Sequence, residues 1–222
     1  MRLRRPPATA TSRARLWGRL LAFYLRFVAA TARIGPVSRE QAVLVFWHEY
    51  NLSLFALAAA RRGDLSHASF TTDTPRGTVI RTIFESLARR PDQVVVLPPP
   101  GERDPAAGRV LARRLGELGS GGFSIVVTPD GPWGPYRVAK PGALIVARQA
   151  GLSILPLAVR ARPAIRLAGR WDRQLLPLPF CRLELVPGER IDVAARAPLR
   201  PLATALQGAL DRVTAAAERR LP

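Results

Sequence analysis

Residues 42–50 read AVLVFWHEY, six apolar residues followed directly by His48 and Glu49. An apolar run of this length, rich in β-branched and aromatic side chains, predicts a strand that is buried on both faces. The segments FSIVVT at 123–128 and ILPLAV at 154–159 have the same character. Strands buried on both faces are typical of a parallel sheet covered by helices, so these three segments predict an α/β fold.

The segments around these strands alternate between helical and extended patterns. Apolar spacing predicts further strands at 65–71 and 93–97, late strands near 183–186 and 191–193, and helices at 51–62, 76–90, 105–118, 143–150 and 202–220. A chain of 222 residues is long enough for one such domain. We therefore expect residues 35–222 to form a single α/β domain, with a mainly parallel central sheet flanked by helices.

The N-terminal region has a different pattern. Residues 1–12 are basic and aperiodic, which predicts a flexible tail, and residues 13–34 predict one amphipathic helix. This helix carries a stripe of arginines beside a broad apolar face containing Trp17, Phe23 and Phe27. Such a helix is typical of a membrane interface, but the same face can pack on the chain's own domain. Both interpretations remain open at this point.

The charge balance is strongly basic, with 34 Lys and Arg against 16 Asp and Glu, a net charge of +18. This favours anionic partners: nucleic acid, an anionic bilayer or phosphorylated substrates. The sequence has no helix-turn-helix, zinc-finger or RNA-binding signature, which argues against nucleic acid. One cysteine and two histidines exclude a disulfide framework and make a metal site unexpected. No apolar stretch reaches the ~18 residues of a conventional membrane span.

Two segments that leave buried strands carry the candidate chemistry. His48 follows the first strand, at the sheet edge where open α/β proteins bind ligands, and its ordinary pKa suits a general base. TPDGPWGP at 128–135 follows the strand at 123–128 and forms a stiff turn, with Arg137 and Lys140 close behind. A capping histidine and an ordinary proline-rich turn are the alternatives. His67, inside a predicted strand, is interpreted as structural.

Several segments together resemble one known family. FWHEY at 46–50, TPDGPWGP at 128–135, KPG at 140–142 and ILPLAV at 154–159 are similar to the lysophospholipid acyltransferase superfamily. RWDRQLLPLPF at 170–180 resembles a bacterial branch of it, once classed as a domain of unknown function. The resemblance implies transfer of a fatty acyl group from acyl-CoA or acyl-carrier protein to a hydroxyl of a lysophospholipid or related lipid. It implies no further cofactor and no metal, and a peripheral position on the cytoplasmic face of the inner membrane.

The resemblance also implies roles for individual residues. His48 falls on the catalytic histidine, which acts as general base, and Asp130 with Gly131 falls on the acceptor-binding motif. Together with nearby cations, the candidate substrate-binding residues are Arg76, Asp130, Gly131, Pro132, Trp133, Gly134, Arg137 and Lys140. Trp171 and Phe180 line an acyl groove or serve packing alone, and Asp172 is expected to pair with Arg173 or with the core loops.

The sequence departs from the family pattern at three motifs, one of which is PPPGER at 98–103, where the branch has Arg-Gly-Ser. The superfamily places an aspartate five residues after its histidine, where this chain has Ser53, so Glu49 and Asp73 become the candidate partners of His48. Trp133 stands where the branch has arginine, which moves the expected phosphate contact to Arg137. These departures keep two alternatives open: a degenerate acyltransferase scaffold, and a non-catalytic protein that binds anionic lipid or nucleic acid.

Overall fold

The computed structural model describes residues 8–35, 40–60, 66–87, 94–97, 105–131 and 133–221. Within these ranges the strands form one seven-stranded sheet, in the order β1-β7-β6-β2-β5-β3-β4. The strands are β1 (Arg33–Ile34), β2 (Val43–Val45), β3 (His67–Thr72), β4 (Val94–Leu97), β5 (Ser124–Val127), β6 (Ile154–Arg166) and β7 (Leu175–Pro187). The helices are α1 (Ala8–Thr31), the 3-10 turn η1 (His48–Tyr50), α2 (Asn51–Ala60), α3 (Pro75–Leu87), α4 (Pro105–Ser120), α5 (Gly142–Ala150) and α6 (Leu199–Arg220).

The centre of the sheet is parallel, which confirms the predicted fold class. Val43 of β2 pairs with Ile125 of β5 on one side and with Ile154 of β6 on the other. All three side chains are fully buried. The three apolar segments that predicted the fold therefore lie next to each other in the middle of the core.

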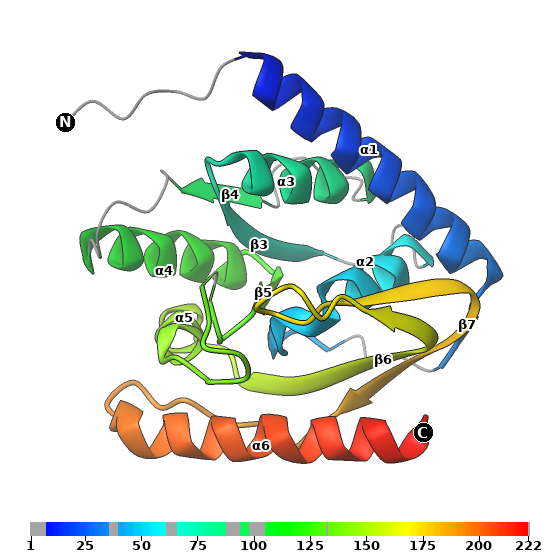
Figure 1. The fold of residues 1–222 in the computed structure, drawn as a ribbon. Coiled ribbons are helices and arrows are strands. Elements are labelled where there is room, and N and C mark those ends of the chain that lie inside the picture. The colour runs from blue at the N-terminus through cyan, green and yellow to red at the C-terminus, as the bar shows by residue number, and fades with distance from the viewer. Residues whose placement is uncertain are drawn as a thin grey trace.

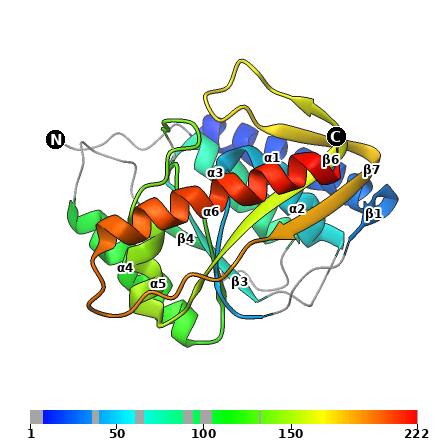
Figure 2. The same ribbon diagram turned by 90° about the horizontal axis from the view of Figure 1, so that it is seen from below.

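Helices cover both faces of the sheet. Helices α1, α2 and α3 pack on one face, and α4, α5 and α6 pack on the other (Figures 1 and 2). The connection from β2 to β3 passes beyond β5, whereas the connection from β5 to β6 passes back beyond β2. Right-handed crossovers in opposite directions place their helices on opposite faces, so a crevice opens at the carboxyl ends of β2 and β5.

The long hairpin of β6 and β7 is the largest difference from the sequence prediction. The predicted strand ended at 159, whereas β6 continues to Arg166, and β7 begins at Leu175, well before the predicted 183–186. The outer half of the hairpin is partly exposed and contains Pro163, Pro177 and Pro179. The arginines and prolines there interrupt the apolar pattern by which a buried strand is predicted, and proline has a low strand propensity. The predicted strand at 191–193 is reduced to one bridge, between Ile154 and Ile191.

Helix α1 begins five residues earlier and ends three residues earlier than the predicted helix at 13–34. Residues 8–12 of the predicted tail are therefore helical, and residues 1–7 lie outside the described ranges. One face of α1 packs on α2, α3 and β7 through Ala22, Leu25 and Val28. The contact with α3 is close, because a Cβ at Gly18 would lie 2.6 Å from Cβ of Thr82.

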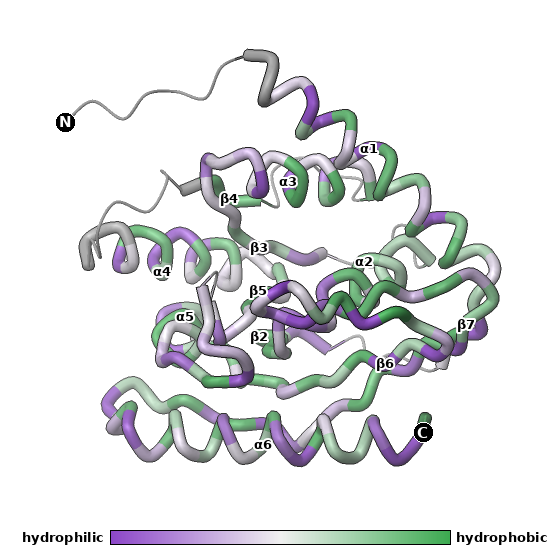
Figure 3. Tube along the Cα trace, viewed as in Figure 1, coloured by the Kyte–Doolittle hydropathy of each residue, from purple (hydrophilic) through white to green (hydrophobic). Residues whose placement is uncertain are grey.

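The other side of α1 remains exposed and apolar. We call this surface the exposed face of α1; it consists of Leu16, Trp17, Leu20, Phe23 and Phe27. Hydrophobic (green) and hydrophilic (purple) segments alternate along α1 in Figure 3. Phe180 of β7, which is 75% exposed, extends the surface through an edge-on contact with Phe27, with ring centroids 6.5 Å apart. None of the described helices combines the length and apolarity that crossing a bilayer requires.

Candidate active site

His48 and Asp130 form a hydrogen-bonded pair at the carboxyl ends of β2 and β5. Their side chains meet because β2 and β5 are adjacent parallel strands and each residue lies just beyond the end of its strand. Nδ1 of His48 lies 2.7 Å from Oδ1 of Asp130. The backbone N–H of His48 donates to the same carboxylate, at 3.3 Å from each oxygen. Asp130 is fully buried, and its carboxylate contacts both the backbone N–H and the ring of His48.

The other ring nitrogen of His48 faces the crevice. The Asp130 carboxylate accepts only, so the neutral imidazole carries its proton on Nδ1 and leaves the lone pair of Nε2 free to accept. Nε2 lies 3.1 Å from the hydroxyl of Thr128, and the His48 side chain is 17% exposed. A substrate hydroxyl that replaced the Thr128 contact would meet a lone pair suited to general base catalysis.

A cavity of about 180 Å³ adjoins His48, between the helices α2 and α3, strand β3 and the hairpin turn. Its apolar lining residues are Leu54, Phe55, Phe70, Ile80, Phe84, Val126 and Trp171. The ring of Trp171 packs against His48, with centroids 5.2 Å apart. The cavity therefore offers apolar walls next to the imidazole of His48.

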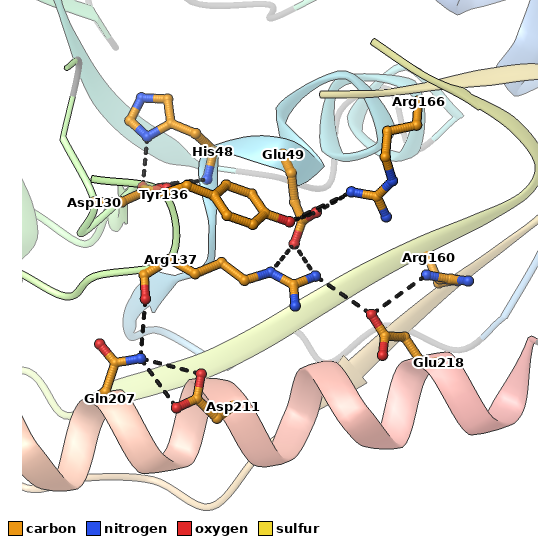
Figure 4. A network of polar contacts seen from close by, with 10 residues as sticks. All are labelled: His48, Glu49, Asp130, Tyr136, Arg137, Arg160, Arg166, Gln207, Asp211 and Glu218. Carbon is orange, nitrogen blue, oxygen red and sulfur yellow. Dashed lines mark hydrogen bonds and ion pairs between the residues drawn. The ribbon is translucent and has the colours of Figure 1, made fainter. Parts of the chain in front are cut away.

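Glu49 does not face His48, which differs from its expected role as the partner carboxylate. Successive residues of a 3-10 turn point about 120° apart, and Glu49 is directed into the core while His48 faces the cavity. The buried Glu49 carboxylate accepts hydrogen bonds from the Tyr136 hydroxyl at 2.8 Å, from Nε of Arg137 at 2.6 Å and from Nη1 of Arg166 at 3.1 Å. Figure 4 shows this arrangement on the opposite side of η1 from the imidazole.

The Glu49 network joins the loop after Asp130 to the hairpin and to α6. Glu218 of α6 accepts from Nη2 of Arg137 at 3.4 Å, and Gln207 donates to the carbonyl of Arg137 at 3.2 Å (Figure 4). Burial lowers the pKa of Arg137, but the charge of Glu49, the neighbouring Tyr50 and Tyr136 and the hydrogen bond to Glu49 together raise that pKa above its ordinary value. Arg137 is thus committed to the network, and its predicted role in holding phosphate is not supported by its position.

Asp73 also lies away from His48. Its side chain is exposed and lines a separate cavity of about 450 Å³ between α1 and α3, together with Arg15 and Arg19. Its predicted role as the partner carboxylate is not supported, because Asp130 already occupies Nδ1. The position that the family gives to the aspartate, Ser53, is buried, and its hydroxyl has no hydrogen-bond partner among the described residues.

The remaining predicted residues divide between the cavity and the surface. Arg76 lines the cavity from the first turn of α3, which lies so close to β3 that a Cβ at Gly77 would be 1.7 Å from the carbonyl oxygen of Thr72. Gly131 also lines the cavity, and a Cβ there would meet Nζ of Lys140 at 2.9 Å.

Trp133 and Gly134 complete the predicted loop. The Trp133 side chain is 66% exposed and lies outside the cavity lining. A Cβ at Gly134 would lie 2.9 Å from Cε3 of Trp171, so glycine allows the hairpin turn to approach the loop. Pro132 lies outside the described residues.

Sequence reasoning assigned Trp171 to an acyl groove or to packing, but it did not include Arg170 and Asp172 among the site residues. Arg170, Trp171 and Asp172 all line the cavity, and they lie between the outer halves of β6 and β7, which the sequence pattern did not predict. Asp172 pairs with Arg170 rather than with Arg173, whose guanidinium lies 4.8 Å from the Tyr136 ring centroid. The available signal was the Arg-Trp-Asp cluster itself.

Within the described ranges, no three His, Cys, Asp or Glu side chains gather as a metal site would require.

Comparisons with known proteins identify the fold. No family model matches the chain. An uncharacterized protein of Rickettsia prowazekii (strain Madrid E) is 25% identical over 187 residues, which cover 79% of this chain and 80% of that protein. The crystal structure of the 1-acyl-sn-glycerophosphate (LPA) acyltransferase PlsC from Thermotoga maritima superposes with a TM-score of 0.55 at 15% identity, covering 96% of this chain and 80% of that one. The chain therefore has a fold like that of this acyltransferase.

Proposed function

We propose that this protein is a membrane-associated acyltransferase that moves a fatty acyl group from a thioester donor to a hydroxyl of a lysophospholipid or related lipid. The observation that supports the proposal most directly is the His48–Asp130 pair at the mouth of an apolar cavity. The fold shared with a lysophosphatidic acid acyltransferase adds to it. The donor is acyl-CoA or acyl-carrier protein.

The proposed reaction uses His48 first as base and then as acid. Nε2 takes the proton of the acceptor hydroxyl while that oxygen attacks the thioester carbonyl carbon and forms a tetrahedral intermediate. As the carbon–sulfur bond breaks, the new ester remains on the acceptor, and the proton passes from Nε2 to the leaving thiolate. The Asp130 carboxylate fixes the tautomer and stabilises the transient imidazolium. Such a base contributes about 10²–10⁴ in rate.

The cavity walls suit an amphiphilic acceptor. Aromatic and aliphatic side chains offer contacts to hydrocarbon, whereas Arg76 in the lining and Lys140 beside Gly131 supply positive charge. Charge-assisted hydrogen bonds from such groups bind phosphate well. We therefore keep Arg76 and Lys140, but not Arg137, as candidate anion ligands.

The proposed location is the cytoplasmic face of the inner membrane, with peripheral attachment. The exposed face of α1 and Phe180 form an apolar surface, and the net charge of +18 attracts anionic lipid. Amphipathic helices with aromatic and arginine residues bind interfaces through both effects.

The test is acyl transfer by the purified full chain on anionic vesicles, with acyl-CoA and acyl-carrier protein as donors and a panel of lysolipids as acceptors. His48→Ala should lower the rate by about a thousandfold. His67→Gln is the matched control, because His67 lies on β3 away from the cavity lining, and it should retain the rate. Full activity of His48→Ala, or no transfer by the wild-type chain with any pair, would overturn the proposal.

The exposed apolar surface supports a second candidate, a lipid-binding protein without catalysis. That function predicts tight binding to anionic vesicles, unaffected by His48→Ala, together with no acyl transfer by the wild-type chain. The same vesicle assay distinguishes the two candidates.

A further inference from the structure

The turn between β6 and β7, residues 167–174, covers the cavity beside His48. Arg170, Trp171, Asp172 and Gln174 from this turn all line the cavity. The proposed reaction uses none of them, although the ring of Trp171 contacts that of His48, with centroids 5.2 Å apart.

Arg170 is held by a buried carboxylate. Its Nε and Nη2 donate to the two oxygens of Asp172, each at 2.8 Å, and Asp172 is only 1% exposed. A carboxylate is costly to bury unless a cation pairs with it. Both Asp172 oxygens are bound by the guanidinium fork, so the aspartate fixes where the arginine lies. The Arg170 side chain remains 41% exposed, and its other N–H groups are free to bind a ligand.

The turn itself is fixed at further points. The backbone N–H of Leu167 donates to the carbonyl of Gln174 at 2.8 Å, which closes the turn. Trp171 packs between His48 and Gly134, and Arg173 stacks on Tyr136 of the Glu49 network. A cation mounted on so well supported a turn is preorganised for a ligand in the cavity.

Two arginines line the cavity. Its titratable side chains are His48, Arg76, Arg170 and Asp172, and the Asp130 carboxylate binds His48. Asp172 occupies two nitrogens of Arg170, so the remaining N–H groups of Arg170 and the guanidinium of Arg76 are the donors for an anion. Arg76 approaches from α3 and Arg170 from the hairpin turn, so an anion in the cavity would meet arginines from two separate elements.

We infer that Arg170, fixed by Asp172, binds the phosphate of the acceptor lipid together with Arg76, and so selects phosphorylated acceptors. The inference rests on the proposed function and deepens it. A guanidinium presents several donors in one plane, which suits phosphate oxygens better than lysine does. The donor also carries phosphate, so the experiment must separate the two sources.

The kinetic test compares 1-acyl glycerol 3-phosphate with the matching 1-acyl glycerol, which lacks the phosphate. Arg170→Gln should raise KM for the phosphorylated acceptor by about ten- to a hundredfold, the value of a charge-assisted bond, and leave KM for the other acceptor and for the donor unchanged. Arg170→Lys should fall between Arg170→Gln and the wild type. Arg113→Gln is the control, because Arg113 is an exposed residue of α4 outside the cavity lining; KM for both acceptors and for the donor should stay at the wild-type value.

Two kinetic outcomes would overturn the inference. A rise in KM for the donor would assign Arg170 to the donor phosphate. An equal loss with both acceptors would make the Arg170–Asp172 pair a structural support. Asp172→Asn separates these roles further, because a positioning role predicts a weaker preference for the phosphorylated acceptor, whereas a purely structural role predicts lower thermal stability with the preference unchanged.

A binding measurement keeps the inference testable even if the chain transfers no acyl group. Isothermal titration with short-chain, non-micellar versions of the same two lipids should show tighter binding of the phosphorylated one by the wild-type chain, and loss of that preference in Arg170→Gln. No preference in the wild-type chain would overturn the inference, whereas a preference without turnover would contradict the proposed function alone.

Discussion

Asp130 Oδ1 lies 2.7 Å from Nδ1 of His48, although the two residues are 82 positions apart in the sequence. The family pattern that the sequence resembles has an aspartate five residues after its histidine, where this chain has the buried Ser53. Here the carboxylate comes from the neighbouring strand instead. In this chain the carboxylate at Nδ1 of His48 therefore belongs to the loop that follows β5.

Asp130→Asn should lower kcat for acyl transfer by about 10²–10⁴, because an amide can donate to Nδ1 and so favours the tautomer with its proton on Nε2. Steady-state kinetics on vesicles measure the change. Ser53→Ala is the control, since its hydroxyl has no partner within the described part of the chain, and it should retain wild-type kcat. Normal kcat in Asp130→Asn would remove Asp130 from the mechanism.

Glu49→Ala should destabilise the fold by about 3–5 kcal/mol, because it leaves Arg137 and Arg166 without their buried counter-charge. Chemical denaturation measures the free energy of unfolding. Glu85→Ala removes an exposed partner of Arg81 and should cost less than about 1 kcal/mol. If Glu49→Ala kept wild-type stability and lost activity, Glu49 would belong to the chemistry after all.

Replacing Trp17 and Phe23 together by serine should weaken binding to anionic vesicles by at least about a hundredfold. Burial of each apolar side chain in the membrane interface contributes about 1.5–3 kcal/mol to the binding free energy. Vesicle co-sedimentation measures the affinity, and thermal unfolding should be unchanged because both side chains are exposed. Val110→Ser alters an exposed apolar residue on α4 and serves as the control. Unchanged binding of the double variant would exclude the exposed face of α1 as the attachment surface.

Stability should fall with acidity through His67. Burial lowers the pKa of His67 to about 4, whereas the unfolded chain keeps the ordinary value near 6.5. Between these values the unfolded state binds more protons, so the free energy of unfolding rises with pH, by up to about 1.4 kcal/mol per pH unit. Denaturant titrations from pH 4 to 7 measure the slope. His67→Gln should flatten it, and an equal slope in both proteins would assign the acid sensitivity to other groups.

The order of strands and helices could be predicted from the sequence because each central strand is apolar throughout. The same logic placed His48 and the loop at 128–135 at one edge of the sheet. The pairing of His48 with Asp130 could not be predicted, since it depends on β2 and β5 being adjacent, which local patterns do not determine. Glu49 was misassigned because neighbours in a 3-10 turn face different directions.

The hairpin turn escaped prediction for another reason. Its strands leave the parallel sheet as a half-exposed ribbon, where Pro163 and several arginines interrupt the alternation that marks a strand. The Arg-Trp-Asp cluster was visible as a motif, but its place above the cavity follows from the register of β6 with β7, in which Arg166 pairs with Leu175. The position of such a motif in the fold cannot be predicted until the strands on either side of it are known.

Helix α1 packs directly on α3, which carries Arg76, and Phe180 on the same exposed surface belongs to the strand that leads away from Arg170. Attachment through this surface would hold the chamber at a constant height and tilt above the lipid. An acceptor would then enter by lateral diffusion and never pass through bulk water. Turnover should accordingly follow the mole fraction of acceptor within the bilayer, and dilution with inert lipid should slow it even when the total amount of acceptor stays the same.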